Sequence, residues 1–183
     1  GEHAATIAGN PVTILTRYTS PTTQLVWATQ YAWERFASSG LSRSFQPWSH
    51  GSTADRNVVA ELTGTTRPSE IVLVTAHLDD MPPGSLAPGA DDDASGATGV
   101  LLAAEALAGH RFQRTVRFVL FTGEEQGLFG SAAYASLLSS AGANVVAVLN
   151  LDMIGWDGSG APSLRLHTRA ASNPGYPADL AVA

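Results

Sequence analysis

Apolar runs that alternate with polar and glycine-rich stretches predict several buried strands in this chain. The runs at 57–62 and 70–76 are strand-like, and the polar stretch 63–69 between them predicts a hairpin. The second run, IVLVTA after Glu70, is continuously apolar, which is typical of a strand covered on both faces.

Helical periodicity precedes these strands. Residues 21–40 predict the first helix, with Ser20 as its N-cap, Pro21 at the first helical position and Gly40 at its end. Its apolar face is expected in the core and consists of Leu25, Trp27, Ala28, Tyr31, Ala32, Phe36 and Ala37.

Strand and helix alternate after residue 90. The predicted elements are helices over 95–108 and 126–139 and strands over 115–121 and 145–151. Other expected elements are loops over 80–90 and 155–162, a strand over 163–168 and the start of a helix over 177–183. A hairpin followed by this alternation predicts an α/β fold, with a mixed, mostly parallel sheet and helices on both faces.

Composition narrows the function classes. The 183 residues are 44% hydrophobic and 14% charged, which fits one globular domain over 1–183. The net charge of −6, without a basic run, argues against nucleic acid and membrane as partners. The chain has no Cys, and all ten basic residues are Arg. These absences exclude a thiol nucleophile, a disulfide, a Cys-ligated zinc and a catalytic lysine.

Ionisable residues follow the apolar strands. Because ligands bind outside the carboxyl ends of strands in α/β sheets, we expect these residues to converge on one crevice. The sets are His77, Asp79 and Asp80 after the second strand, Asp91, Asp92 and Asp93 before the next helix, Glu124 and Glu125 after the third strand, and Asp152 at the end of the fourth.

Convergence of so many carboxylates has an electrostatic consequence. Two carboxylates about 4 Å apart repel by about 4 kcal/mol at an effective dielectric constant near 20. The crevice therefore needs protonation or a cation. Carboxylates combined with an imidazole suit Zn²⁺, and Mn²⁺ or Co²⁺ less exclusively. Asp79 is close enough in sequence to hold the other ring nitrogen of His77.

Each set also has an ordinary structural explanation. The three aspartates can cap a helix, Glu124 and Glu125 can begin a solvated helix, and His77 can be a hydrogen-bonded core residue. Their joint occurrence at successive strand ends favours the metal site.

Four motifs, AHLDD, APGADDDASG, FTGEEQGLFGS and NLDMIGW, resemble the zinc aminopeptidase family typified by bacterial leucyl aminopeptidases in both order and spacing. The earlier segment RYTSPT, followed by a helix, is also similar to that family. The resemblance covers residues 11–168 and implies the di-zinc exopeptidase fold.

The resemblance implies a pair of zinc ions and a role for each residue. His77 and Asp152 would bind one ion, Glu125 the other, and Asp91 would bridge them. Glu124 would be the general base that deprotonates a metal-activated water. The remaining expected roles are Asp79 orienting His77, Asp92 supporting the ligands after a cis peptide bond that follows Asp91, and Met153 edging the pocket for the substrate's first side chain.

The implied reaction is removal of the N-terminal residue from peptides with a free N-terminus. The family also has a second histidine ligand further downstream, so we expect a chain truncated by its C-terminal third, in which one of the two zinc ions is lost or weak. His167 is expected in a strand rather than as that ligand, and His3, His50 and His110 lie outside the motifs.

The alternative functions are a glutaminyl-cyclase-like acyltransferase with one zinc, a carboxypeptidase or dipeptidase of the same fold, and an inactive fragment or noncatalytic ectodomain. The Lys-free, Ala- and Gly-rich composition and a start without Met favour a secreted or periplasmic protein. Oligomeric state is not readable from the sequence.

Overall fold

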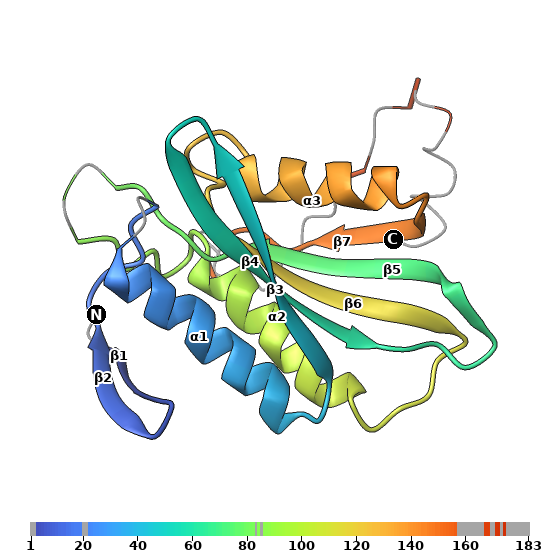
Figure 1. The fold of residues 1–183 in the computed structure, drawn as a ribbon, viewed down its shortest axis with the longest axis horizontal. Helices are drawn as coiled ribbons and strands as arrows, with labels where there is room; N and C mark the ends of the chain where they lie inside the picture. The colour runs from blue at the N-terminus through green and yellow to red at the C-terminus, as the bar shows by residue number, and fades with distance from the viewer. Residues whose placement is uncertain are drawn as a thin grey trace.

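Five strands form one mixed sheet between two layers of helix (Figure 1). The computed structural model describes residues 3–19, 22–82, 84, 86–156, 167, 168, 171, 172 and 174. The strand order is β3-β4-β6-β5-β7. The strands are β3 (Ser42–His50), β4 (Thr53–Leu62), β5 (Arg67–His77), β6 (Arg114–Phe121) and β7 (Asn144–Asn150).

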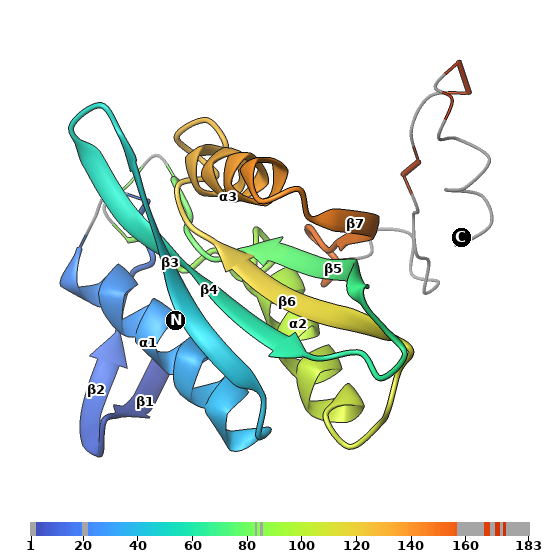
Figure 2. The ribbon, with the colours of Figure 1, turned by 45° about the vertical axis from the view of Figure 1, so that its right-hand side comes forward.

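The three strands at one side of the sheet are parallel. Strand β5 lies between β6 and β7 and pairs in parallel with both, whereas β3 and β4 are antiparallel to their neighbours. Helix α2 (Ala94–Leu107) connects β5 to β6, and α3 (Phe129–Ser140) connects β6 to β7. These connections run in opposite directions along the sheet. Because such crossovers are right-handed, α2 and α3 cover opposite faces (Figure 2).

The expected hairpin between 57–62 and 70–76 was wrong. Strand β6 lies between β4 and β5, so the two predicted strands are not neighbours. The hairpin partner of β4 is β3, joined by a turn in which Gly51 has φ of 57°. Strand β3 was not expected from the sequence, because it is polar, mostly exposed and contains Pro47, which is tolerated on an edge strand.

Helix α1 (Thr23–Ser38) begins later than predicted. Its N-cap is Thr22, whose side chain accepts a hydrogen bond from the Leu25 N–H at 3.1 Å. The expected cap Ser20 and Pro21 lie outside the described residues. Tyr31, expected in the core, is 37% exposed, because the buried positions of α1 form a narrower stripe than the predicted apolar face. That stripe consists of Leu25, Ala28, Thr29, Ala32 and Phe36.

The second half of the chain follows the predicted pattern more closely. Strands β6 and β7 and helix α2 agree with their predicted bounds to within one residue. Helix α3 starts three residues later than predicted, because 123–128 form a turn with Gly127 at φ 121° and Leu128 at φ 63°. The described residues of 80–90, and Gly155 and Trp156, are in loops as expected.

The two ends of the chain differ from the expected pattern or lie outside the described residues. A separate hairpin, β1 (His3–Ile7) with β2 (Asn10–Ile14), was not predicted. His167 and Thr168, at the end of the expected strand 163–168, are in no helix or strand. The rest of that strand and the expected helix over 177–183 lie outside the described residues.

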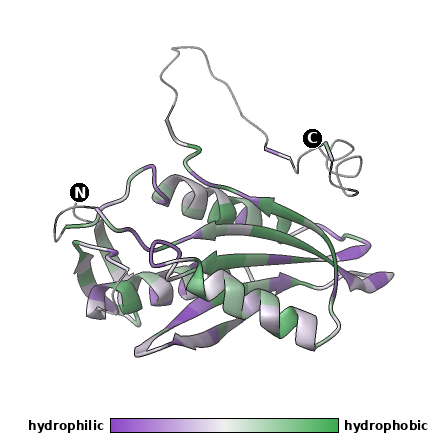
Figure 3. Cartoon of the chain, turned by 90° about the horizontal axis from the view of Figure 1, so that it is seen from above, coloured by the Kyte–Doolittle hydropathy of each residue, from purple (hydrophilic) through white to green (hydrophobic). Residues whose placement is uncertain are grey.

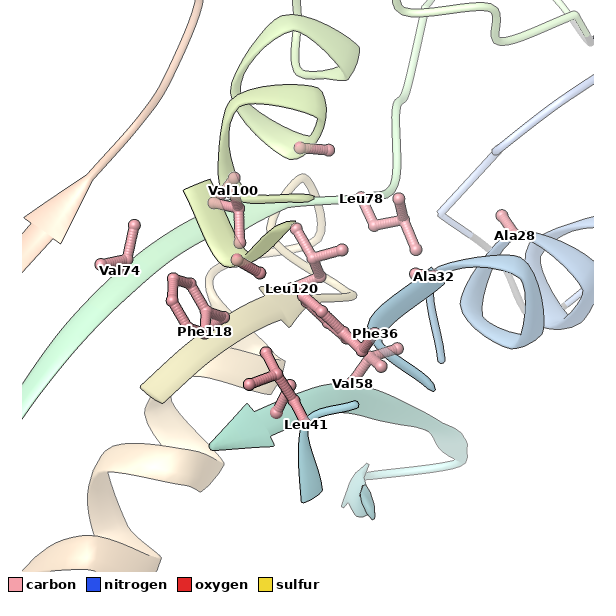
Figure 4. Packing of buried hydrophobic residues seen from close by; sticks show 14 of the residues in the cluster. Ala28, Ala32, Phe36, Leu41, Val58, Val74, Leu78, Val100, Phe118 and Leu120 are labelled. Atoms are coloured by element: carbon pink, nitrogen blue, oxygen red, sulfur yellow. The ribbon is translucent and has the colours of Figure 1, made fainter. Parts of the chain in front are cut away.

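Alternating side chains of the sheet fill two cores, one on each face. Phe118 and Leu120 of β6 point toward α1 and α2, where they pack near Phe36 and Val100 (Figure 4). Val119, between them in sequence, packs on the opposite face with α3. The strands in the middle of the sheet are accordingly hydrophobic over most of their length (Figure 3).

None of the helices in the described part of the chain has the length and apolar character needed to cross a membrane.

Phe118 tests the core between the sheet and the helices α1 and α2. It is fully buried in the central strand, so Phe118→Ala is expected to lower the free energy of unfolding by about 3–5 kcal/mol. Phe118→Leu, which leaves a much smaller void, should cost roughly 1–1.5 kcal/mol. Urea denaturation of both variants measures the difference, and equal losses would contradict this packing.

Candidate metal centre

The carboxyl ends of β5, β6 and β7 meet at one edge of the sheet. His77 is the last residue of β5, Glu124 and Glu125 follow β6, and Asp152 follows β7 by two residues. The chain leaves β5 toward α2 on one face and β6 toward α3 on the other. A crevice opens between adjacent strands where their connections diverge in this way, which is the usual ligand site of an α/β sheet.

His77 lies at the centre of the charged groups. Its Nε2 is 3.0 Å from Asp92 Oδ1. One potential ligand atom from each of His77, Asp92 and Asp152 lies within 4.8 Å of the others. His77 is buried, Asp92 is half-buried and Asp152 is exposed, so the group opens toward solvent. An imidazole with carboxylates at this spacing fits a divalent cation such as zinc.

Asp79 orients two parts of the site through different atoms. Its backbone carbonyl lies 3.0 Å from His77 Nδ1, whereas its carboxylate Oδ1 is 3.9 Å from that nitrogen. The fully buried carboxylate instead accepts hydrogen bonds from the backbone N–H of Glu124 at 3.2 Å and of Glu125 at 3.4 Å. The imidazole is therefore oriented by the main chain of Asp79, and the glutamates by its side chain.

Asp93 ties three segments together. It is fully buried and caps α2 by accepting from the Gly96 N–H at 2.9 Å. Its carboxylate also accepts from the N–H of His77 at 3.2 Å and of Met153 at 3.3 Å. Asp93 was expected in the crevice and as a possible helix cap, but nothing in the chain order indicates the other two donors.

The structure places Asp92, and not the expected bridging residue Asp91, beside His77. The Asp91 carboxylate accepts from Ser95 Oγ at 3.0 Å and from the Gly155 N–H at 2.8 Å, and these contacts hold it toward the loop after β7. The expected cis peptide bond after Asp91 was wrong by one residue, since it joins Asp92 and Asp93.

Met153 lies beside the metal-capable group, whereas three other histidines of the described residues are not part of it. Met153 is 54% exposed next to Asp152, and its φ is 51°. His50, His110 and His167 are exposed and are not part of the metal-capable group found among the described residues. His3 is in strand β1.

Arg17 is a neighbour of the cluster that the sequence analysis did not single out, although it opens the RYTSPT segment. Its guanidinium donates to the carbonyls of Leu78 at 2.8 Å, Pro88 at 3.0 Å and Gly89 at 2.7 Å. It therefore joins the segment after β5 to the loop before the aspartates. Its positive charge also acts on Asp80 and Asp93.

The crowded charges shift several pKa values upward. Burial raises the pKa of Asp93 to about 6, against the favourable effect of the His77 charge. Burial also raises the pKa of Glu124, and the charges of Asp79 and Asp152 add to this. The pKa of Glu125 rises through burial and the charge of Asp92. The site therefore favours bound protons, or a cation in their place.

The pKa of His77 is shifted in the same direction. Burial acts to lower it, but the surrounding carboxylates, led by Asp93 and Asp79, raise it by more. The imidazole therefore binds its proton more tightly than an exposed histidine does.

A separate apolar cavity of about 510 Å³ lies among the β1–β2 hairpin, α1, α2 and the loop at 87–90. Ile14, Tyr31 and Leu101 line it. None of the metal-capable residues His77, Asp92 and Asp152 does, so it is distinct from the charged crevice.

Comparison with known proteins agrees with this geometry. The model of peptidase family M28 matches residues 57–180, which is more than half of the chain and includes every motif quoted above except RYTSPT. The chain therefore belongs to peptidase family M28. The resemblance to the zinc aminopeptidase family that the motifs indicated is thereby confirmed.

Individual relatives show the same similarity over part of their length. A probable zinc metalloprotease of Pyrenophora tritici-repentis is 39% identical over 104 residues, which are 54% of this chain and 22% of that protein. A probable leucine aminopeptidase of Trichophyton verrucosum is 37% identical over 122 residues, or 61% of this chain and 33% of that protein. The chain thus spans about a fifth to a third of these two relatives.

A solved structure shares the fold. The LapA aminopeptidase of Legionella pneumophila superposes with a TM-score of 0.66 at 24% identity, covering 78% of this chain and 40% of that one. The expected mixed α/β fold is therefore confirmed.

The raised pKa values predict how stability depends on pH in the metal-free protein. A proton that binds more tightly in the folded state stabilises it below the unfolded pKa, and this stabilisation is lost as pH rises through the folded pKa. For Asp93 the window runs from 3.8 to about 6, and His77 extends it above 6.5. We therefore expect the Tm in chelator to fall as pH rises from about 5 to above 6.5.

Scanning calorimetry measures this trend. Addition of a divalent cation should flatten it, because the cation replaces the protons as the counter-charge. A Tm that rises over the same range in chelator would contradict the charge arrangement described above.

Proposed function

We propose that this protein is a zinc-dependent aminopeptidase, which hydrolyses the bond after the N-terminal residue of peptides. The single observation that carries the proposal is the group of His77, Asp92 and Asp152 with ligand atoms within 4.8 Å, next to the two glutamates of the loop after β6. Membership of peptidase family M28 and the names of the relatives support it.

The residues that would hold zinc follow from the donor set. His77, Asp92 and Asp152 would hold one ion. Glu125 would contribute to a second, with Asp92 shared between them, because Asp92 lies 3.0 Å from His77 and its charge also acts on Glu125. Bound zinc lowers the pKa of a water toward ~7 and polarises a carbonyl group.

Glu124 would move the proton. Burial raises the pKa of Glu124 above its ordinary value, and a carboxylate with a raised pKa is better suited to accept a proton from the attacking water and to return it to the leaving amine. The water oxygen bonds to the carbonyl carbon, the C–N bond breaks, and the products are a free amino acid and a peptide shortened by one residue. The carboxylate of Asp79 keeps Glu124 in place by accepting a hydrogen bond from the Glu124 backbone N–H.

Met153 would line the pocket for the first side chain of the substrate, since it is exposed directly beside Asp152.

Export of the protein from the cell stays a prediction.

Glu124→Gln tests the general base. It removes the proton acceptor while keeping the size of the side chain, so we expect turnover of a free N-terminal peptide to fall about 10²- to 10⁴-fold. Zinc content should remain, because Glu124 is not a proposed ligand. Glu105→Gln makes the same chemical change in an exposed residue on α2 and serves as the control. Unchanged turnover in Glu124→Gln would exclude this role.

Asp92 and Asp91 allow a matched test of the metal ligand. We expect Asp92→Asn to weaken zinc binding by at least about tenfold, whereas Asp91→Asn keeps an oxygen for its Ser95 and Gly155 contacts and should bind zinc nearly as the original protein does. Isothermal titration with zinc measures both affinities, and native mass spectrometry counts the ions. The opposite order of the two affinities would assign the ligand to Asp91.

The substrate assay separates the remaining alternatives. An aminopeptidase cleaves peptides whose C-terminus is amidated and fails on peptides whose N-terminus is acetylated, and a carboxypeptidase shows the reverse. A glutaminyl-cyclase-like enzyme would instead form pyroglutamate from an N-terminal glutamine without shortening the peptide.

A further inference from the structure

A buried polar network lies on the opposite side of the glutamate loop from Asp79. The glutamate loop is defined here as residues 122–128, which carry Glu124 and Glu125. Trp48 of β3, Asn57 of β4 and Thr122 are 5%, 0% and 0% exposed, respectively. None of the three residues is charged, and none is among the residues proposed to hold zinc or move a proton.

Asn57 holds both ends of the loop with one side chain. Its Oδ1 accepts from the backbone N–H of Thr122 at 3.1 Å, and its Nδ2 donates to the carbonyl of Gly130 at 2.8 Å. The other Nδ2 hydrogen is directed to Gln46 Oε1 at 2.5 Å. The amide oxygen and both amide hydrogens are therefore in use, which offsets the cost of burying the group.

Thr122 is held a second time through its hydroxyl. The indole N–H of Trp48 donates to Thr122 Oγ1 at 2.9 Å, and this hydroxyl donates to the Arg56 carbonyl at 3.2 Å. The strands β3 and β4 thus fix the point at which the chain leaves β6 and enters the loop.

Two glycines permit this close approach. A Cβ on Gly123, whose φ is 71°, would lie 2.5 Å from the Trp48 ring. A Cβ on Gly130 would lie 2.4 Å from Asn57 Oδ1 and 2.2 Å from the Thr122 carbonyl oxygen. No side chain fits at either position, so the loop lies directly against the network.

We infer that Trp48, Asn57 and Thr122 are positioning residues that fix Glu124 and Glu125 relative to His77. The loop is held from one side by Asp79 on the segment after β5 and from the other by β3 and β4. Displacement of a catalytic group by about 1 Å can cost as much as about 10²-fold in rate. This inference rests on the proposed function, in which these two glutamates carry the chemistry.

The chain offers a matched pair of threonines for the test. Thr115, near the start of β6, is 3% exposed, and its hydroxyl accepts from the Gly64 N–H at 3.0 Å and donates to the Pro68 carbonyl at 2.8 Å. Thr122, just after the end of the same strand, makes the corresponding two bonds. Thr122→Val and Thr115→Val therefore remove the same number of hydrogen bonds from equally buried positions, but only the first touches the glutamate loop.

Three measurements compare these variants with the original protein. We expect Thr122→Val to lower kcat about tenfold with KM nearly unchanged, to weaken zinc binding about tenfold, and to speed amide hydrogen exchange at Glu124 and Glu125 about tenfold. Thr115→Val should match the original protein in all three, and Thr122→Ser, which keeps the hydroxyl, should recover most of the loss.

Equal exchange rates and equal zinc affinities in the two valine variants would overturn the inference. If Thr122→Val does not fold, Trp48→Phe removes only the indole donor and keeps most of the ring packing, and the same criteria apply to it. The hydrogen exchange measurement requires neither zinc nor turnover. Failure of the proposed function would instead show as a lack of zinc binding and hydrolysis in the unmodified protein, so the two failures are distinguishable.

Discussion

Repulsion among the carboxylates at one edge of the sheet is the constraint on which the rest of the site depends. Two of these groups, Asp79 and Asp93, are fully buried, and each is stabilised by main-chain N–H donors. The donors belong to the end of β5, the start of α2, the glutamate loop and the loop after β7. The hydrogen bonds that make burial of these charges tolerable therefore also bring the four segments together. In the crowded crevice, burial and the neighbouring carboxylates raise the pKa values of Glu124 and Glu125.

The sheet supplies the rigid support for this arrangement. Strand β5 carries His77 and is paired on both sides. Strand β6, which leads into the glutamate loop, pairs with β4. The loop contacts Asp79 of the segment after β5 on one side, and Asn57 of β4 and Trp48 of β3 on the other.

Much of the fold could be predicted from local pattern, with failures where partners are remote. Strands β6 and β7 and helix α2 were predicted to within one residue, because burial on both faces or along one stripe leaves a strong periodic signal. The pairing of β4 with β5 was wrong because β6, some fifty residues later, lies between them. Strand β3 was missed because an exposed edge strand has little apolar alternation. The N-cap of α1 is Thr22 rather than the expected Ser20, because several hydroxyl residues there can cap equally well.

The sequence by itself determined the chemistry of the site: an imidazole and several carboxylates, distributed over successive strand ends, with the motifs of peptidase family M28. Only the tertiary structure decided which aspartate faces His77. Asp91 and Asp92 are adjacent in a turn and chemically identical, so no local pattern distinguishes them. Ser95 and the loop after β7 hold Asp91 away, and the backbone directs Asp92 inward. Asn57 lies outside every motif, and the sequence does not reveal the positioning role of Thr122 although it lies within FTGEEQGLFGS. The role of both residues comes from hydrogen bonds between segments more than sixty residues apart, which form only once the strands are paired.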